Sequence, residues 1–199
     1  PMPTLKEVEF YLTGLWLLFK QDPRGLSYLD FSDRGTMRSF WAVVFVLPMT
    51  VLSFIWWRGL YLETLPEGMD VGALFFFRLG LVEVANWIVP LVLVGLLTWL
   101  AGVGSKFQSI IVVSNWLAVP VSYGYGLILL MMMLVPSLTA VAVLLSYGLA
   151  LTLIITLFRV LRMLLGDHRL TIATVTMVLI VPAMILSEML ERYLDVYPV

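Results

Sequence analysis

The chain has 199 residues, of which 61% are hydrophobic and 13% are charged, and its net charge at pH 7 is −1. A soluble globular domain of this composition would expose far too much apolar surface to water, so composition excludes that class. A near-neutral charge without a basic stripe also excludes a typical nucleic-acid-binding protein. We therefore expect an integral membrane protein.

The first element in the chain is a predicted helix over Thr4–Lys20. Apolar residues recur in it at helical spacing, and Thr4 and Glu7 form a capping-box pattern at its start. The charges of Lys6, Glu7 and Glu9 interrupt the apolar run, which is unlike a signal peptide. We predict an amphipathic interfacial helix that either lies in the headgroup plane or packs against the protein's own spans.

A polar loop over Gln21–Arg38 follows, in which charges alternate with aromatic and aliphatic residues. Its charged residues are Asp22, Arg24, Asp30, Asp33, Arg34 and Arg38. Two interpretations stay open. The arginines contact anionic lipid headgroups, or the loop is a docking site for a cytoplasmic partner.

Five apolar stretches come next, each about long enough to cross the roughly 30 Å hydrocarbon core of a bilayer. They are Ser39–Trp57, Val84–Gly102, Phe107–Val135, Ser137–Phe158 and Leu170–Ser187. Their connections are short and contain no linker-like segment. The sequence thus predicts an all-α integral membrane bundle of five transmembrane helices, with residues 1–38 as a cytoplasmic segment and residues 39–199 as the transmembrane domain.

The two ionisable residues closest to membrane depth, Arg78 and Glu83, lie just before the second apolar stretch. A single helix from Val71 to Gly102 would be ~48 Å long, so either this helix projects from the membrane or residues 71–82 form a separate element. Glu83 and Asn86 share a helix face. Ionisable groups at this depth are candidates for a substrate or proton site, although a structural role, snorkelling or an interhelical bond, is the more usual one.

The third and fourth spans are expected to form a tight hairpin that turns at Pro136, because the charge-free run over residues 107–158 is too long for one span. Small residues at i and i+4 are predicted to let these two helices approach closely. They are Ser122 and Gly126 in the third span, and Ser146 and Ala150 in the fourth.

Four of the five spans contain an internal proline: Pro48, Pro90, Pro120 and Pro182. Each frees a backbone carbonyl, as in the broken helices of transporters, but prolines are also common as simple kinks. The motifs at residues 86–90 and 115–120, each Asn-Trp followed by Pro, lie on spans of opposite direction. They resemble an inverted repeat in which Asn86 and Asn115 share an interface, or they match by coincidence.

The distribution of Lys and Arg predicts the orientation, because positive residues flank the cytoplasmic ends of spans. Nine of them share one side and three the other: Lys6, Lys20, Arg24, Arg34, Arg38, Lys106, Arg159, Arg162 and Arg169 against Arg58, Arg78 and Arg192. We predict a bacterial inner-membrane protein with a cytoplasmic N-terminus and an external C-terminus.

Catalytic chemistry is poorly supplied in this chain, which has no Cys and one His. His168 lies in a turn between two spans, and no metalloprotease, hydrolase or nucleotide-binding motif is present. We predict no catalytic residue, no metal site and no cofactor, and hence a protein that is not an enzyme.

The plan of a cytoplasmic N-terminal segment, five closely spaced spans over Phe40–Leu194 and a short external tail resembles the Yip-domain family of membrane proteins. The resemblance is one of topology, and no functional residue is transferred from it. It implies a non-enzymatic membrane organiser.

Two functions follow from these observations. The first is an accessory or scaffold component of a membrane assembly, whose spans and polar loop contact a membrane-protein partner or a second copy; its apolar surfaces include Phe75–Phe77 and Met131–Met133. The second is a small transporter or lipid-handling protein. Its predicted polar site among the kinked helices comprises Arg78, Glu83, Asn86, Asn115 and Tyr123. A cavity lined by these residues would favour the second function.

Overall fold

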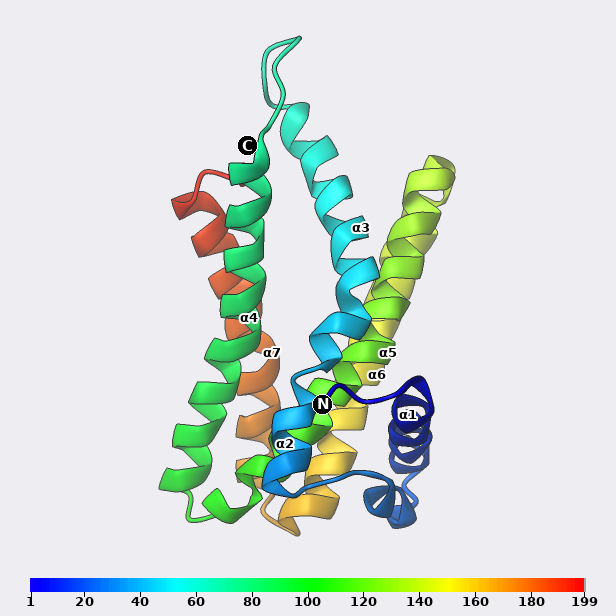
Figure 1. Ribbon diagram of the computed structural model, residues 1–199, viewed down its shortest axis with the longest axis vertical. Helices are drawn as coiled ribbons and strands as arrows, with labels where there is room; N and C mark the ends of the chain where they lie inside the picture. The colour runs from blue at the N-terminus through cyan, green and yellow to red at the C-terminus, as the bar shows by residue number, and fades with distance from the viewer. Residues whose placement is uncertain (199) are drawn as a thin grey trace.

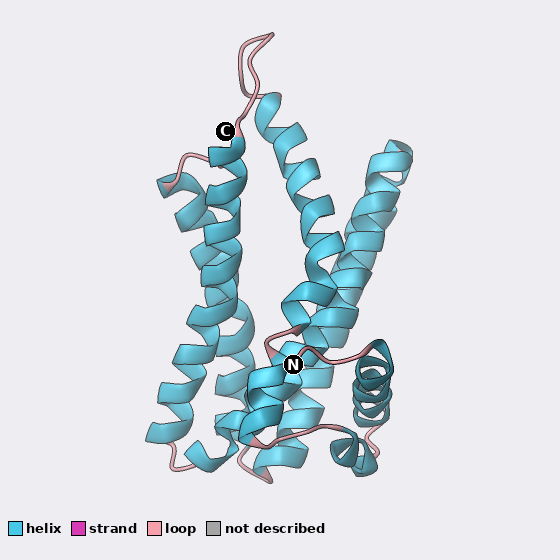
Figure 2. Ribbon diagram, viewed as in Figure 1, coloured by secondary structure: helices cyan, strands magenta, loops and turns pink. Residues whose placement is uncertain are grey.

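The structure is a computed structural model that describes residues 1–198, and within that range it contains helices and no strands (Figure 2). The α-helices are α1 (Leu5–Phe19), α2 (Asp33–Ser39), α3 (Ala42–Leu62), α4 (Ala73–Leu100), α5 (Phe107–Leu134), α6 (Thr139–Leu165) and α7 (Arg169–Tyr193). Three short 3₁₀ helices connect them: η1 (Pro23–Tyr28), η2 (Gly104–Lys106) and η3 (Pro136–Leu138).

Five helices, α3 to α7, are long and apolar enough to cross a membrane, which confirms the all-α five-span fold class. The first of these spans includes α2, so that it starts at Asp33. Residues 73–82 belong to α4, which continues without a break to Leu100. The second span is therefore one long helix, and Arg78 and Glu83 both lie on it.

The spanning helices form two groups. α4 packs along α7, and α5 packs against both α3 and α6. Figure 1 shows that the two groups lie close together at the end where α1 and α2 lie and diverge toward the other end. We call the first end, which also holds the α4–α5 and α6–α7 turns, the basic end. The opposite end, with the α3–α4 loop and the C-terminal segment, is the acidic end.

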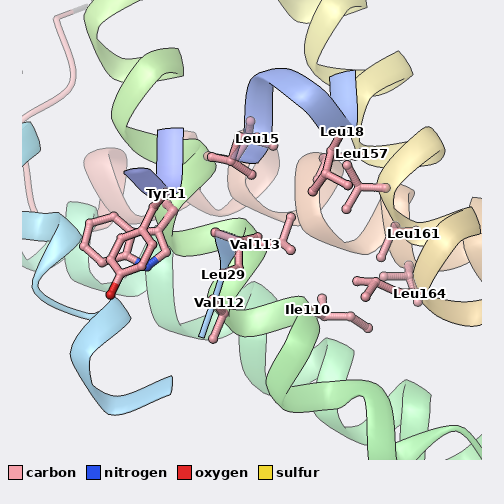
Figure 3. Packing of buried hydrophobic residues seen from close by; sticks show 14 of the residues in the cluster. Tyr11, Leu15, Leu18, Leu29, Ile110, Val112, Val113, Leu157, Leu161 and Leu164 are labelled. Atoms are coloured by element: carbon pink, nitrogen blue, oxygen red, sulfur yellow. The ribbon is translucent and has the colours of Figure 1, made fainter. Parts of the chain in front are cut away.

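The main hydrophobic core lies at the basic end, where α5 is surrounded by α1, α6 and α7 (Figure 3). Ile110, Val112, Val113 and Trp116 of α5 are almost fully buried in it. Leu18 of α1 packs into the same core. This cluster closes the bundle at the basic end, whereas the acidic end has only a small second cluster around Phe75, Leu79 and Val196.

The predicted N-terminal helix forms with its capping box: the Thr4 N–H donates to Glu7 Oε2 at 2.7 Å, and the Glu7 N–H donates to Thr4 Oγ1 at 3.3 Å. One face of α1 packs against α5 and α6. On a neighbouring face Leu5 and Trp16 are 77% and 58% exposed. Of the two expected placements, the structure shows the intraprotein one; contact of the exposed face with the membrane surface stays a prediction.

The small-residue contacts of α5 differ from the expected ones. A Cβ atom on Gly126 would collide with Met49 of α3, so that Gly126 faces α3 rather than α6. Gly124 instead lies against Leu149 of α6. The two glycines are two residues apart, which is ~200° around a helix. The spacing in the sequence identified a close-packed face of α5, but α3 occupies that face.

Candidate functional site

Three adjoining cavities lie between the α4–α7 pair and the group of α3, α5 and α6. The one nearest the acidic end, here the acidic-end cavity, has a volume of about 350 Å³. Residues from all five spans line it. Its polar lining residues are Ser53 of α3, Glu83 of α4, Tyr125 of α5, Ser146 of α6 and Glu191 of α7.

Two further cavities continue from it along the inner side of α4. The middle cavity, of about 230 Å³, shares Glu83 with the acidic-end cavity. The asparagine cavity, of about 200 Å³, shares Asn86, Trp87 and Asn115 with the middle cavity. The three cavities thus form a series with common walls, which ends against the hydrophobic core of the basic end.

Glu83 lies deep in the bundle, because the midpoint of the 28-residue α4 falls between Asn86 and Trp87 and Glu83 is only ~5 Å from it along the axis. No ion pair involves Glu83 or Glu191 within residues 1–198. The nearest arginine in sequence to Glu191, Arg192, binds Glu188 instead. Two carboxylates without a basic partner therefore face the acidic-end cavity.

Asn115 is 1% exposed and connects three helices. Its Oδ1 accepts a hydrogen bond from Trp87 Nε1 of α4 at 2.9 Å, and its Nδ2 donates to Ser39 Oγ of α2 at 2.9 Å. The Ser39 hydroxyl donates in turn to the carbonyl of Thr36. Asn115 therefore fixes α4 and α2 on α5 while it forms part of the wall of two cavities.

Asn86 has an unused hydrogen-bonding atom. Its Nδ2 donates to Ser187 Oγ of α7 at 2.6 Å, but its Oδ1 is buried and has no hydrogen-bond partner within residues 1–198. Ser114 Oγ is also buried without a partner. Both residues line the asparagine cavity, and a buried polar atom without a hydrogen bond is costly. Each of these atoms can accept a hydrogen bond from a molecule in that cavity.

The structure brings three of the five expected site residues together. Glu83, Asn86 and Asn115 all line the middle cavity, and Asn86 and Asn115 also share the asparagine cavity. Arg78 and Tyr123 lie elsewhere. Arg78 donates to the carbonyl of Leu194, and Tyr123 donates to the carbonyl of Phe45 in the turn before Pro48. Both have structural contacts rather than a place in these cavities.

Of the residues expected to pack the third and fourth spans together, two line cavities instead. Ser122 lines the middle cavity and Ser146 the acidic-end cavity. The hydroxyl of Ser146 donates to the carbonyl of Ala142, one turn earlier in α6. Their small size leaves room at the inner surface of the bundle.

Five of the six charged residues of the polar loop have hydrogen-bond or ion-pair partners within the protein, whereas Arg34 has none within residues 1–198. Asp22 accepts hydrogen bonds from Arg24, and Asp33 accepts one from Gln108 of α5. The hydroxyl and backbone N–H of Ser32 both donate to Asp30, which lowers the pKa of that carboxyl. Arg38 binds Glu7 of α1. These contacts order the loop, and docking of a partner on it stays a prediction.

Sequence reasoning missed several residues of the site, chiefly Glu191, Ser187 and Trp87. Glu191 lies beyond the predicted end of the fifth span at Ser187, so the sequence placed it outside the bundle. Ser187 meets Asn86 across 101 residues of sequence. Trp87 stands in the repeated Asn-Trp motif, which was the one available signal for it. Within residues 1–198 there is no group of three or more His, Cys, Asp or Glu side chains that could hold a metal ion.

Comparison of the chain with protein-family models, with curated proteins and with solved structures gives no match. The resemblance in topology to the Yip-domain family therefore stays a prediction.

Proposed function

We propose that this protein is a small transporter that binds a hydrophilic, positively charged molecule in the cavities between its two helix groups. The observation that carries the proposal is the series of three cavities with shared polar walls, which includes Glu83 near the middle of α4. Polar cavities at membrane depth are costly in a protein whose helices only need to pack, and they mark substrate pathways in transporters.

The chemistry of the walls supports a cationic substrate. The carboxylates of Glu83 and Glu191 can only accept hydrogen bonds when ionised, and the unpaired Oδ1 of Asn86 is also an acceptor. No Lys or Arg lines any of the three cavities. A protonated amine offers the complementary positive charge and N–H donors.

The arrangement of helices supports access from the acidic end. Glu83 is exposed within its open cavity, whereas the core around Val112 and Trp116 seals the basic end. Rocking of the α4–α7 pair against the other three spans would reverse this arrangement, as in alternating access. Pro48, Pro90, Pro120 and Pro182 lie inside α3, α4, α5 and α7 and provide places where these helices can bend.

We place the protein in a bacterial inner membrane, with the basic end in the cytoplasm and the C-terminus outside. The nine-to-three distribution of Lys and Arg supports this orientation. The acidic-end cavity would then open to the outside, where it could capture its substrate. An accessory role in a larger assembly is the competing proposal, and it predicts no binding of a small molecule at Glu83.

The two proposals are distinguished by measuring the melting temperature of purified protein with methylammonium, putrescine or spermidine. We expect at least one amine to raise the melting temperature of the wild type, since a ligand at about 100 times its Kd stabilises by about 2.7 kcal/mol. The shift should disappear in Glu83→Gln. Glu67→Gln, which removes an exposed carboxylate of the α3–α4 loop, is the matched control.

The active amine is then followed into proteoliposomes. Uptake that depends on Glu83 and not on Glu67 supports transport. If no amine in the panel shifts the melting temperature, or if Glu83→Gln responds like the wild type, the cationic-substrate proposal is wrong.

A further inference from the structure

A further cavity, separate from the three of the proposed transport site, lies on the outer surface of the bundle at the basic end. It is a groove of about 760 Å³ between α6 and the C-terminal end of α1. Its lining includes Gln21, Ile154, Ile155, Phe158, Arg159 and Arg162. The groove therefore has an apolar floor on α6 and a polar, cationic rim.

Arg159 is held in place at this rim. Its Nη1 donates to the carbonyl of Phe19, the last residue of α1, at 2.8 Å, and its guanidinium lies 5.7 Å from the centroid of the Phe19 ring. No carboxylate pairs with Arg159 within residues 1–198. Its other N–H groups and its full positive charge are therefore available to an anion.

Arg162 adds positive charge at the same rim. The carboxylate paired with Arg162 is that of Asp167 at 3.7 Å, and this pair is weak because both side chains are more than half exposed. Lys20 precedes Gln21, but its ammonium lies over the Trp16 ring and it is not among the residues that line the groove. Within residues 1–198, two arginines and no carboxylate line the groove, so the rim attracts anions.

The backbone of Gln21 provides an independent indication. Gln21 has a φ of 64°, in the left-handed region that favours glycine. It occupies the C′ position of a Schellman motif, since its N–H donates to the carbonyl of Leu18 and the Asp22 N–H donates to that of Leu17. Glycine would fit this position without strain. The glutamine instead places a side-chain amide on the rim of the groove.

The depth of the groove matches one class of molecule. α6 has 27 residues and its midpoint is Thr152, so Arg162 lies ~15 Å from the midpoint along the axis and Arg159 lies ~10 Å from it. A hydrocarbon core of roughly 30 Å ends at about the level of Arg162. Ile154 and Ile155 lie at acyl-chain depth, and Arg162 lies at the level of the headgroup phosphates. Arg159 lies about 5 Å deeper, from where a long side chain can reach the phosphates.

We propose that this groove binds an anionic phospholipid of the leaflet at the basic end. Its phosphate contacts Arg159, Arg162 and the Gln21 amide, and one acyl chain follows Ile154, Ile155 and Phe158. The bound lipid touches both α6 and the end of α1, so it also holds α1 against the bundle. This site is independent of the proposed transport function.

The test is native mass spectrometry of protein released from nanodiscs that contain equal amounts of phosphatidylglycerol and phosphatidylcholine. The wild type should retain phosphatidylglycerol in preference. Arg162→Gln should lower the ratio of retained phosphatidylglycerol to phosphatidylcholine about fivefold, the effect of one basic residue near an anionic leaflet. Arg169→Gln removes the charge of the first residue of α7, outside the groove, and should leave the ratio unchanged.

Ile155→Trp tests the groove itself, because it fills the apolar floor and leaves every charge in place. It should lower retention of phosphatidylglycerol as Arg162→Gln does. Arg159→Gln is avoided because Arg159 also binds α1. Equal retention of the two lipids by the wild type, or wild-type retention by both groove variants, would overturn the proposal. The proposal would also be overturned if inorganic phosphate, added to the protein in phosphatidylcholine nanodiscs, stabilised the protein as much as phosphatidylglycerol does.

Discussion

At the scale of single residues, Glu7 has two structural roles at once. Its carboxylate completes the capping box of α1 and also binds Arg38 of α2, whose Nη2 lies 2.9 Å from Oε1. Arg38 in addition donates to the carbonyl of Pro1. One carboxylate thereby joins the start of α1 to the start of the first span. The hydrogen bond from the Thr4 N–H and those from Arg38 lower the pKa of Glu7 below 4.5.

This lowered pKa gives a prediction for the pH dependence of stability. Because the pKa of Glu7 is lower in the folded than in the unfolded protein, its stabilisation is complete above pH 4.5 and is lost as the pH falls through the folded value. The wild type should melt at a higher temperature than Glu7→Gln at pH 7. The difference should shrink as the pH falls below 4.5 and vanish once Glu7 is protonated in the folded protein as well.

Comparison with Glu9→Gln controls for general charge effects, since the Glu9 carboxylate has no hydrogen bond or ion pair within residues 1–198. The melting temperature of Glu9→Gln should stay close to that of the wild type at every pH tested. The role assigned to the Glu7 carboxylate would be contradicted if the difference in melting temperature between wild type and Glu7→Gln were as large at low pH as at pH 7.

At the scale of elements, the packing of α1 on η1 depends on two glycines that lie back to back. A Cβ atom on Gly14 would collide with Tyr28 and with the carbonyl of Gly25, and one on Gly25 would collide with the carbonyl of Gly14. The backbones of α1 and η1 thus touch. This contact positions the end of α1, and with it Lys20 and Gln21, beside α6.

We predict that Gly14→Ala destabilises the protein by about 1–3 kcal/mol, as overpacking does, although alanine favours helix more than glycine. Its melting temperature should fall by about 2–4 °C for each kcal/mol in a chain of this size. Gly80→Ala in α4 is the matched control, since nothing lies within 4 Å of its added methyl group. It should be neutral or stabilising by up to about 1 kcal/mol. Equal melting temperatures for the two variants would rule out the close contact of α1 and η1.

At the scale of the whole molecule, one end of the bundle is closed by packing and the helices diverge at the other end. The hydrophobic core and the N-terminal elements gather at the basic end, whereas the α4–α7 pair leaves the other spans toward the acidic end (Figure 1). Exposed apolar residues such as Leu144 and Leu100 cover the outside, where lipid surrounds them. The polar walls of the cavities are thus the inner surface of a bundle whose outer surface is apolar.

The orientation of this bundle is open to a direct test, because the chain has no cysteine of its own. Thr64→Cys labels the α3–α4 loop at the acidic end, and Ser105→Cys labels the α4–α5 turn at the basic end. In intact cells of a bacterial host, a membrane-impermeant maleimide should modify Thr64→Cys only. Both should react after lysis, and the cysteine-free chain should not react at all. Labelling of Ser105→Cys in intact cells would reverse the orientation.

Several features were predictable from the sequence because their causes are local. A bilayer forces each apolar stretch of sufficient length to satisfy its backbone within one helix, so five stretches became five spanning helices. The capping box of Thr4 and Glu7 involves residues three apart and formed as expected. Glu83 and Asn86 share a helix face, and they line the same cavity.

Other features were decided only by the tertiary structure, because they depend on which helix faces meet. The partner of Gly126 on α5 was α3, not α6, and no spacing within α5 could specify that choice. Glu191 and Ser187 joined Glu83 and Asn86 from the far end of the chain. The sequence by itself determined how many helices are long and apolar enough to cross a membrane and which of them contain a proline. The side-chain packing between distant segments decided which polar groups share a cavity and where that cavity opens, since such packing depends on complementary shapes that a local pattern does not contain.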